Sequence, residues 1–123
     1  MILVDTSIWA DHIARPIPLM VELVESQLVC SHPHVIGELA LGNLRQFNLV
    51  IRFLKNLRQI VVAKDGEVLH LIKSHKLLGS GIGYSDAHLI ASLLLEEEAL
   101  LWTRDKRLNA VAERFSVAYS PLQ

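Results

Sequence analysis

Short apolar runs alternate with helix-like stretches along this chain, and the alternation narrows the folds open to it. Runs typical of buried strands occupy residues 2–4, 28–30, 60–62 and 100–103. The stretch between consecutive runs is long enough for at least one helix. Strands that follow one another in parallel need such crossover connections. We therefore predict an α/β fold of three layers, with helices flanking a mainly parallel sheet of four to five strands.

Helical patterns fill the stretches between these runs. The predicted helices cover residues 7–15, 18–26, 33–42, 44–57, 66–78, 85–98 and 106–114, and residues 117–119 are predicted to form an edge strand. Thr6 or Ser7 is the expected N-cap of the first helix, and Ser85 is expected to cap the helix that starts there. The glycine-rich segment 79–83 cannot continue a helix, so it is predicted to be a loop.

Length and composition are those of an ordered protein in a reducing environment. A chain of 123 residues, 51% of them hydrophobic, is predicted to form a single domain that spans residues 1–123. Its one cysteine, Cys30, has no second cysteine to pair with, which excludes an intrachain disulfide and disfavours a thiolate metal site. No signal-peptide pattern or membrane-spanning run is present, so we expect a cytoplasmic protein with no membrane contact.

The net charge of -1 does not by itself indicate a nucleic-acid partner, which usually requires a basic excess. The chain has 12 Lys and Arg and 13 Asp and Glu residues. If four of those acids surround a metal ion, however, positive side chains outnumber negative ones on the remaining surface. Overall charge is therefore weak evidence against a nucleic-acid substrate.

Four acidic residues stand where the chain changes from one predicted element to the next. Asp5 ends the first strand, Asp105 follows the last one, Asp86 opens a helix after the glycine loop, and Glu38 lies on a short helix. In a parallel α/β domain, such positions converge on one crevice at the carboxyl ends of the strands. Carboxylates gathered there repel one another unless a cation lies between them. A divalent metal held by carboxylates is typical of phosphodiester chemistry.

Each acid also has an ordinary structural interpretation. Asp5 is suited to begin a turn, and a negative charge at Asp86 would offset the positive amino end of its helix. Asp105 is a good N-cap for the helix at 106–114, and Glu38 fits a solvated flank. Taken together the metal hypothesis explains more, because all three aspartates precede helices and two of them end strands.

The local sequences around these acids resemble, as an ordered set, those of PIN-domain ribonucleases. The segments are V-D-T-S at 4–7, E-L-A-L-G-N at 38–43, S-D-A-H-L-I-A at 85–91 and L-L-W-T-R-D at 100–105. They are most similar to the VapC toxins of bacterial VapBC toxin–antitoxin pairs, and the resemblance extends over essentially the whole chain. It implies a PIN-type fold and an endoribonuclease that a VapB-like antitoxin inhibits.

The resemblance also implies roles for individual residues. Asp5, Glu38, Asp86 and Asp105 match the acidic positions that hold one or two Mg²⁺ or Mn²⁺ ions. Hydroxyls that orient the ligands or the attacking water are expected at Thr6, Ser7 and Thr103. Water activated by metal would then attack an RNA phosphodiester, and products with 5′-phosphate and 3′-hydroxyl ends are expected.

Two groups of basic residues are candidate RNA contacts. Arg104, Lys106 and Arg107 flank Asp105, where they would hold the backbone or simply form a solvated helix start. Arg52 and Lys55 lie on the polar face of the helix at 44–57. The apolar face of that helix is wider than a surface helix needs, so a second subunit or a segment of a partner is expected to cover part of it, unless neighbouring helices do. We expect a homodimer.

Other functions and sites fit the sequence less well. A non-catalytic RNA-binding or scaffold module would be favoured by the loss of an acid, and all four are present. A phosphatase or phospho-receiver domain would carry a second acidic residue near Asp5, and this chain has none there. His32 and His34 are interpreted as a turn around Pro33 and not as a zinc site, and His88 as a packing or surface residue.

Overall fold

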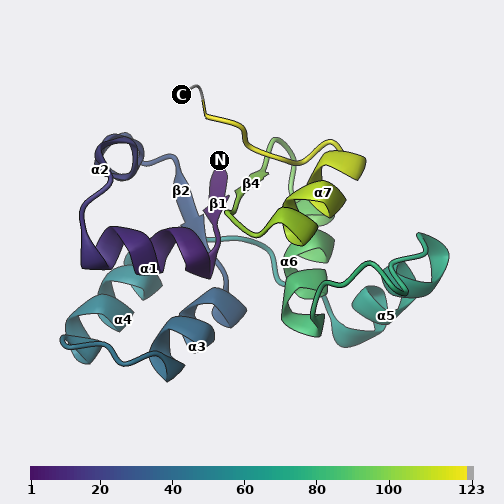
Figure 1. The fold of residues 1–123 in the computed structure, drawn as a ribbon, viewed down its shortest axis with the longest axis horizontal. Coiled ribbons are helices and arrows are strands. Elements are labelled where there is room, and N and C mark those ends of the chain that lie inside the picture. Colours follow the sequence, from purple (N-terminus) through teal and green to yellow (C-terminus); the bar gives the residue numbers. More distant parts are fainter. Residues whose placement is uncertain (122–123) are drawn as a thin grey trace.

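The computed structural model describes residues 1–121, and its centre is a four-stranded sheet in the order β3-β2-β1-β4 (Figure 1). All three strand pairings are parallel. The strands are β1 (Ile2–Val4), β2 (Val29–Ser31), β3 (Arg58–Gln59) and β4 (Leu100–Trp102). Because β1 has neighbours on both edges, the chain begins in the middle of the sheet.

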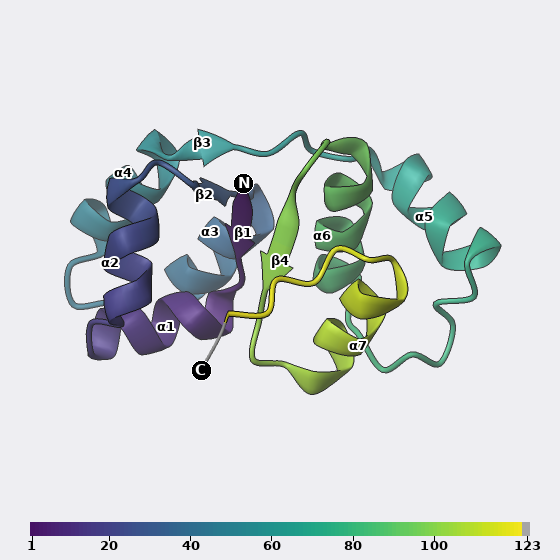
Figure 2. The same ribbon diagram turned by 90° about the horizontal axis from the view of Figure 1, so that it is seen from above.

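Helices cover both sides of the sheet, as the alternating pattern predicts. Figure 2 shows one group, α1 to α4, on one side of β1 and β4, and a second group, α5 to α7, on the other. The helices are α1 (Thr6–Ala14), α2 (Pro18–Glu25), α3 (Pro33–Leu41), α4 (Phe47–Asn56), α5 (Asp65–Ser74), α6 (Tyr84–Leu95) and α7 (Lys106–Arg114). The predicted α/β class with a parallel sheet is confirmed.

The core lies between β1, β4 and the helices packed on them. Leu3 and Val4 of β1 and Leu101 of β4 are fully buried. In α6 every residue from 87 to 93 is buried. This burial explains why the sequence of α6 is apolar almost all round, since a helix enclosed by protein needs no polar face. None of the helices in residues 1–121 is long and apolar enough to cross a membrane.

The third strand lies earlier in the chain than the sequence pattern predicts. The apolar run at 60–62 was expected to pair, but β3 is Arg58–Gln59. Ile60 is buried, and its N–H still donates to the carbonyl of Ser31 at 3.0 Å. Val61 and Val62 then leave the sheet and are 50% and 47% exposed. The apolar run therefore marks the exit from the sheet, because a short edge strand has only one neighbour to hold it.

Several element boundaries and caps also differ from expectation. The helix α4 begins at Phe47, where 44 was predicted, and α5 ends at Ser74, where 78 was predicted. The N-caps are Asp5 for α1 and Gly83 for α6, so the predicted caps at Thr6, Ser7 and Ser85 are wrong. All three hydroxyls instead bond to other side chains of the fold.

The carboxyl-terminal segment adds little to the sheet. Leu101 and Ala118 form an isolated parallel bridge, with two backbone hydrogen bonds of 2.7 and 2.8 Å, where the sequence pattern predicted an edge strand. Cys30 on β2 is buried, and this burial raises the pKa of its thiol to about 12. A buried thiol that stays protonated at neutral pH is a poor nucleophile.

Candidate active site at the carboxyl edge of the sheet

The parallel sheet brings three of the candidate acids to one edge. Asp5 directly follows β1, and its N–H donates to the carbonyl of Trp102, the last residue of β4, at 2.9 Å. Asp105 lies just beyond that strand. The helix α6 precedes β4, so its first turn, which contains Asp86, lies where the strands end. This is the convergence that the alternation of strands and helices predicts.

Asp5 is the most deeply placed of the four acids, with only 6% of its surface exposed. Its Oδ2 accepts hydrogen bonds from Thr103 Oγ1 at 2.6 Å and from Ser7 Oγ at 3.3 Å. These hydroxyls are held in turn, because Thr103 Oγ1 accepts from the N–H of Asp105 and Ser7 Oγ accepts from that of Arg104. The carboxylate of Asp5 is therefore fixed by side chains from two sides of the β1–β4 pair.

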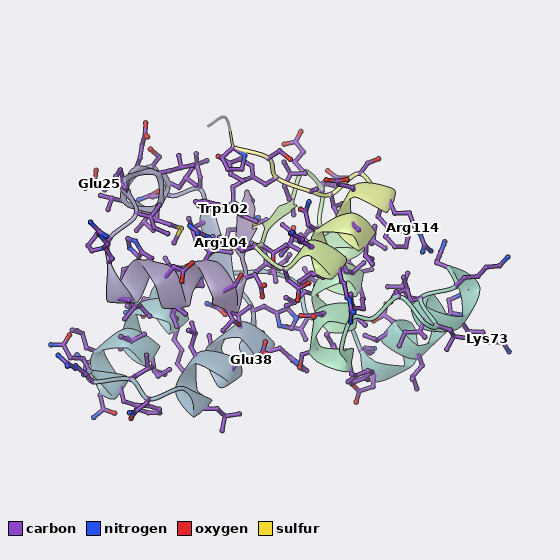
Figure 3. The ribbon with its side chains drawn as sticks, in the orientation of Figure 1. Glu25, Glu38, Lys73, Trp102, Arg104 and Arg114 are labelled. Carbon is purple, nitrogen blue, oxygen red and sulfur yellow. The ribbon has the colours of Figure 1, made fainter. Side chains whose placement is uncertain are left out.

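Glu38 reaches the same region from α3. Thr6 Oγ1, in the first turn of α1, donates to Glu38 Oε1 at 3.3 Å. Figure 3 shows Glu38 near the centre of the view, between α1 and α6. Glu38 is exposed, so its carboxylate can reorient more easily than that of Asp5.

Asp86 shows that the four carboxylates lie close enough to act on one another. Burial raises the pKa of its carboxyl to about 6, with further increases from the charges of Asp5, Glu38 and Asp105. Among the described residues, none of the four forms an ion pair with a basic side chain. The site is thus a concentration of like charge without a protein counter-charge.

Asp105 has a structural role as well. Its Oδ1 accepts from the N–H groups of Arg107 at 2.9 Å and Leu108 at 3.1 Å, so it caps α7 as its ordinary interpretation predicts. The residue is exposed, and its Oδ2 makes no hydrogen bond with the described part of the chain. Capping therefore uses one carboxylate oxygen and leaves the other free to act at the site.

The donors suit a hard divalent cation, although they are not assembled around one. All four groups offer carboxylate oxygen, the ligand that Mg²⁺ and Mn²⁺ prefer. In residues 1–121, however, no three His, Cys, Asp or Glu side chains are arranged so that they could hold a metal ion as they stand. The mutual repulsion of this cluster is a physical reason for that spacing, since uncompensated carboxylates avoid close approach.

Comparison with known proteins agrees with this architecture. The family model of the PIN domain matches residues 2–114. The chain belongs to the PIN-domain family. It is also 45% identical over 118 residues to a protein named Ribonuclease VapC32 in two strains of Mycobacterium tuberculosis, CDC 1551 / Oshkosh and ATCC 25618 / H37Rv. Each match covers 96% of this chain and 95% of the relative, so the predicted resemblance to a VapC-type PIN protein is confirmed.

The three basic residues around Asp105 of this PIN domain differ in their contacts. Arg104 is half exposed, and its Nε pairs with Asp11 Oδ2 on α1 at 3.2 Å. The side chain of Arg107 crosses the glycine loop so closely that a Cβ on Gly81, whose φ is +86°, would lie 2.7 Å from Arg107 Cδ. Lys106 is exposed at the start of α7. A side chain at position 81 would be strained by the positive φ and would have to displace the side chain of Arg107, which lies against this loop.

The second basic group lies elsewhere. Arg52 and Lys55 are exposed on α4, and Figures 1 and 2 place α4 on the far side of α3 from α6 and α7. The fold therefore does not bring these two residues to the acidic cluster. Contact with RNA at α4 would require a substrate that extends well past the site.

The sequence pattern missed a polar network beside the acids. His34, His88, Asp65 and Tyr84 interact with one another or with Ser85, next to Asp86. His88 is buried, as a packing role predicts, and His32 accepts from the N–H of His34 at the start of α3, as the turn interpretation predicts. The spacing of His34 four residues before Glu38 was the available clue, because such residues share a helix face.

Proposed function

We propose that this PIN-domain protein is a metal-dependent endoribonuclease toxin of the VapC type. The observation that carries the proposal is the placement of Asp86, half-buried among the charges of Asp5, Glu38 and Asp105 without a basic partner in the described chain. The name of its relatives, ribonuclease, supports RNA as the substrate. We take the whole chain, 1–123, as one such domain that acts in the cytoplasm.

We infer that Asp5, Glu38, Asp86 and Asp105 hold one or two Mg²⁺ or Mn²⁺ ions. Burial of like charges without counter-ions favours a bound cation, and oxygen-only donors favour a hard one. Glu38 and the free oxygen of Asp105 are exposed and so can turn toward the ion. A divalent cation held here would lower the pKa of bound water and stabilise the charge of the departing oxygen.

The remaining side chains have supporting roles in this proposal. Thr103 and Ser7 hold Asp5 in one orientation, and Thr6 steadies Glu38. Exposed Lys106 is well placed for a backbone phosphate, while Arg104 and Arg107 would have to exchange their present contacts for one. The acidic side chains thus bind the metal ion, and the basic side chains near α7 attract the RNA.

The first test is cleavage of total RNA by purified protein free of antitoxin. We expect discrete fragments with Mg²⁺ or Mn²⁺ and none with EDTA, and the ends of the fragments should carry 5′-phosphate and 3′-hydroxyl groups. Fragments that persist in EDTA would contradict a metal-dependent mechanism. Failure to cleave RNA and to bind metal would favour a non-catalytic RNA-binding module.

We infer that a cognate VapB-like antitoxin and a second copy of the chain are the protein partners. The support lies on α4, where Phe47, Leu49 and Phe53 are 46%, 56% and 42% exposed and only Leu54 is buried. Leu49 and Phe53 also line an apolar cavity of about 350 Å³ with Trp9 of α1. An apolar face this open is expected to be covered by another chain.

The double substitution Arg52→Glu with Lys55→Glu is expected to weaken binding of a long RNA about tenfold at low salt. Each lost phosphate contact lowers both affinity and its dependence on salt concentration. Fluorescence anisotropy would measure this in an Asp5→Asn background that does not cleave the RNA. Lys73→Glu with Lys76→Glu, on and just after α5, is the charge-matched control, and equal affinities in both double variants would show that α4 does not meet the RNA.

A further inference from the structure

His34 joins the two helices that carry Glu38 and Asp86. Its Nδ1 lies 3.0 Å from Ser85 Oγ, between residues 51 positions apart in the sequence. On α3, His34 comes four residues before Glu38, so the two side chains share a face of the helix. On α6, Ser85 directly precedes Asp86. The hydrogen bond therefore connects α3 to α6 beside two of the four acids.

The ring of His34 is held in place by the buried ring of His88. It stacks on the ring of His88 with 4.5 Å between centroids and 24° between planes. His88 is 3% exposed, and its Nε2 contacts Asp65 Oδ1 at 2.9 Å. Tyr84 donates to the same oxygen at 3.0 Å, and these two hydrogen bonds hold the pKa of Asp65 below its usual value. An ionised Asp65 accepts a hydrogen bond from His88 Nε2–H, which fixes the orientation of that ring.

His32, the N-cap of α3, makes a second connection between α3 and α6. Its Nδ1 accepts from the N–H of His34 at 3.0 Å, so its Nε2 carries the ring proton and donates to Ser92 Oγ at 3.1 Å. His32 is fully buried, and burial lowers its pKa to about 4, which keeps the ring neutral. The start of α3 is thus fastened to α6 at Ser85 and again two turns later at Ser92.

The hydrogen bonds between α3 and α6 oppose the electrostatic repulsion between the acidic residues that these helices carry. The charges of Asp5, Glu38 and Asp105 all raise the pKa of Asp86, so the carboxylates on α3 and α6 repel each other. Repulsion of this kind pushes the two helices apart when no cation is bound. A hydrogen bond between the neighbouring residues holds them together, at the same end of α6.

We propose that the His34–Ser85 hydrogen bond is a positioning clasp, which keeps α3 against α6 so that Glu38 and Asp86 can bind the same divalent cation. The inference rests on the proposed metal centre. In this proposal neither residue binds the cation or the substrate. Both act through the acids, and loss of such an outer partner typically lowers metal affinity about 10–100-fold.

Two substitutions remove the bond from opposite sides. His34→Phe keeps a ring to stack on His88 but has no nitrogen for Ser85, and Ser85→Ala removes one oxygen with little change of shape. Ser85→Thr keeps the hydroxyl and is the conservative rescue. The control is His70→Ala, because His70 is an exposed histidine on α5 that, among residues 1–121, forms hydrogen bonds only with nearby Ser74.

The experiment is a titration of each full-length protein with Mn²⁺, far below the thermal transition of every variant. We expect His34→Phe and Ser85→Ala each to weaken Mn²⁺ binding about tenfold or more, and the double variant to be no worse than either one. Ser85→Thr and His70→Ala should bind like the parent. A merely structural role would lower the melting temperature and leave Mn²⁺ affinity unchanged.

Two outcomes would contradict the clasp, and only the second would also contradict the proposed metal centre. Parent-like Mn²⁺ affinity in both His34→Phe and Ser85→Ala would exclude the positioning role and leave the metal centre intact. Failure of the parent protein to bind Mn²⁺ would exclude the metal centre and the clasp with it. Should His34→Phe not fold, Ser85→Ala alone decides, since it removes a single atom from a helix surface.

Discussion

Asp5→Asn is expected to reduce RNA cleavage by about 10³-fold or more while the protein remains folded. Asp5 is the most buried of the four acids, and two hydroxyls fix its carboxylate. An amide whose oxygen takes the place of Asp5 Oδ2 can still accept from both Thr103 and Ser7, so the local hydrogen bonds survive. The negative charge proposed to hold the cation does not survive, and preorganised charge usually contributes more to such catalysis than any other effect.

Cleavage of a defined RNA under single-turnover conditions would measure this loss, with circular dichroism as the check on folding. Asp11→Asn is the matched control, because Asp11 is an exposed aspartate of α1 that pairs with Arg104 and not with the acidic cluster. Asp11→Asn should cleave within a few-fold of the parent. If Asp5→Asn cleaves like the parent, the assignment of the acidic site is wrong.

Asp86→Asn is expected to reduce cleavage by a similar factor and, in the absence of metal, to stabilise the protein at neutral pH. In the folded protein the pKa of Asp86 is about 6, above the value of about 3.9 for an unfolded chain. The stabilising effect of its protonation is therefore complete below about pH 3.9 and is lost as the pH rises through about 6. Asparagine stays neutral throughout, so the variant keeps that contribution. Because the group is half-buried and screened by solvent, we expect a gain on the order of 1 kcal/mol above pH 6.

Urea unfolding of metal-free protein at pH 7.5 and at pH 4.5 would measure this difference. We expect Asp86→Asn to exceed the parent clearly at pH 7.5 and only slightly at pH 4.5. Adding Mn²⁺ at pH 7.5 should stabilise the parent more than the variant, because only the parent keeps the full set of ligands. The control is Glu97→Gln, because Glu97 is exposed and lies just after the carboxyl end of α6. An equal gain in the free energy of unfolding for this variant would show that general charge reduction is responsible.

Much of the acidic cluster could be predicted from the sequence, because parallel strands all end at the same edge of a sheet. An apolar run of three residues ends directly before Asp5, and another ends three residues before Asp105, which places both acids at one edge once the strands are parallel. The order of the motifs also indicates the PIN family, which the comparisons show. No tertiary information was needed for these inferences.

Hydroxyl side chains show where local rules fail. Thr6, Ser7 and Ser85 have the residue types of N-caps, and the sequence pattern predicted that role for them. In the fold, Ser7 bonds to Asp5, Thr6 to Glu38 and Ser85 to His34, each a contact with another side chain. A cap is chosen by the local backbone, but these partners come from α3 or from the crowded end of β1, and packing there gives each hydroxyl a better partner than its own helix.

The sequence by itself determined the alternation of strands with helices and the positions of Asp5, Asp86 and Asp105 near element ends, because apolar periodicity and charge can be read locally along the chain. Tertiary structure alone decided that Asp86 is half-buried with a raised pKa, that Asp105 caps α7 through Oδ1, and that α4 holds Arg52 and Lys55 away from the acids. It also decided that His34 meets Ser85. These outcomes depend on distances between segments far apart in the sequence, and only the packing of α3, α6 and the sheet sets those distances.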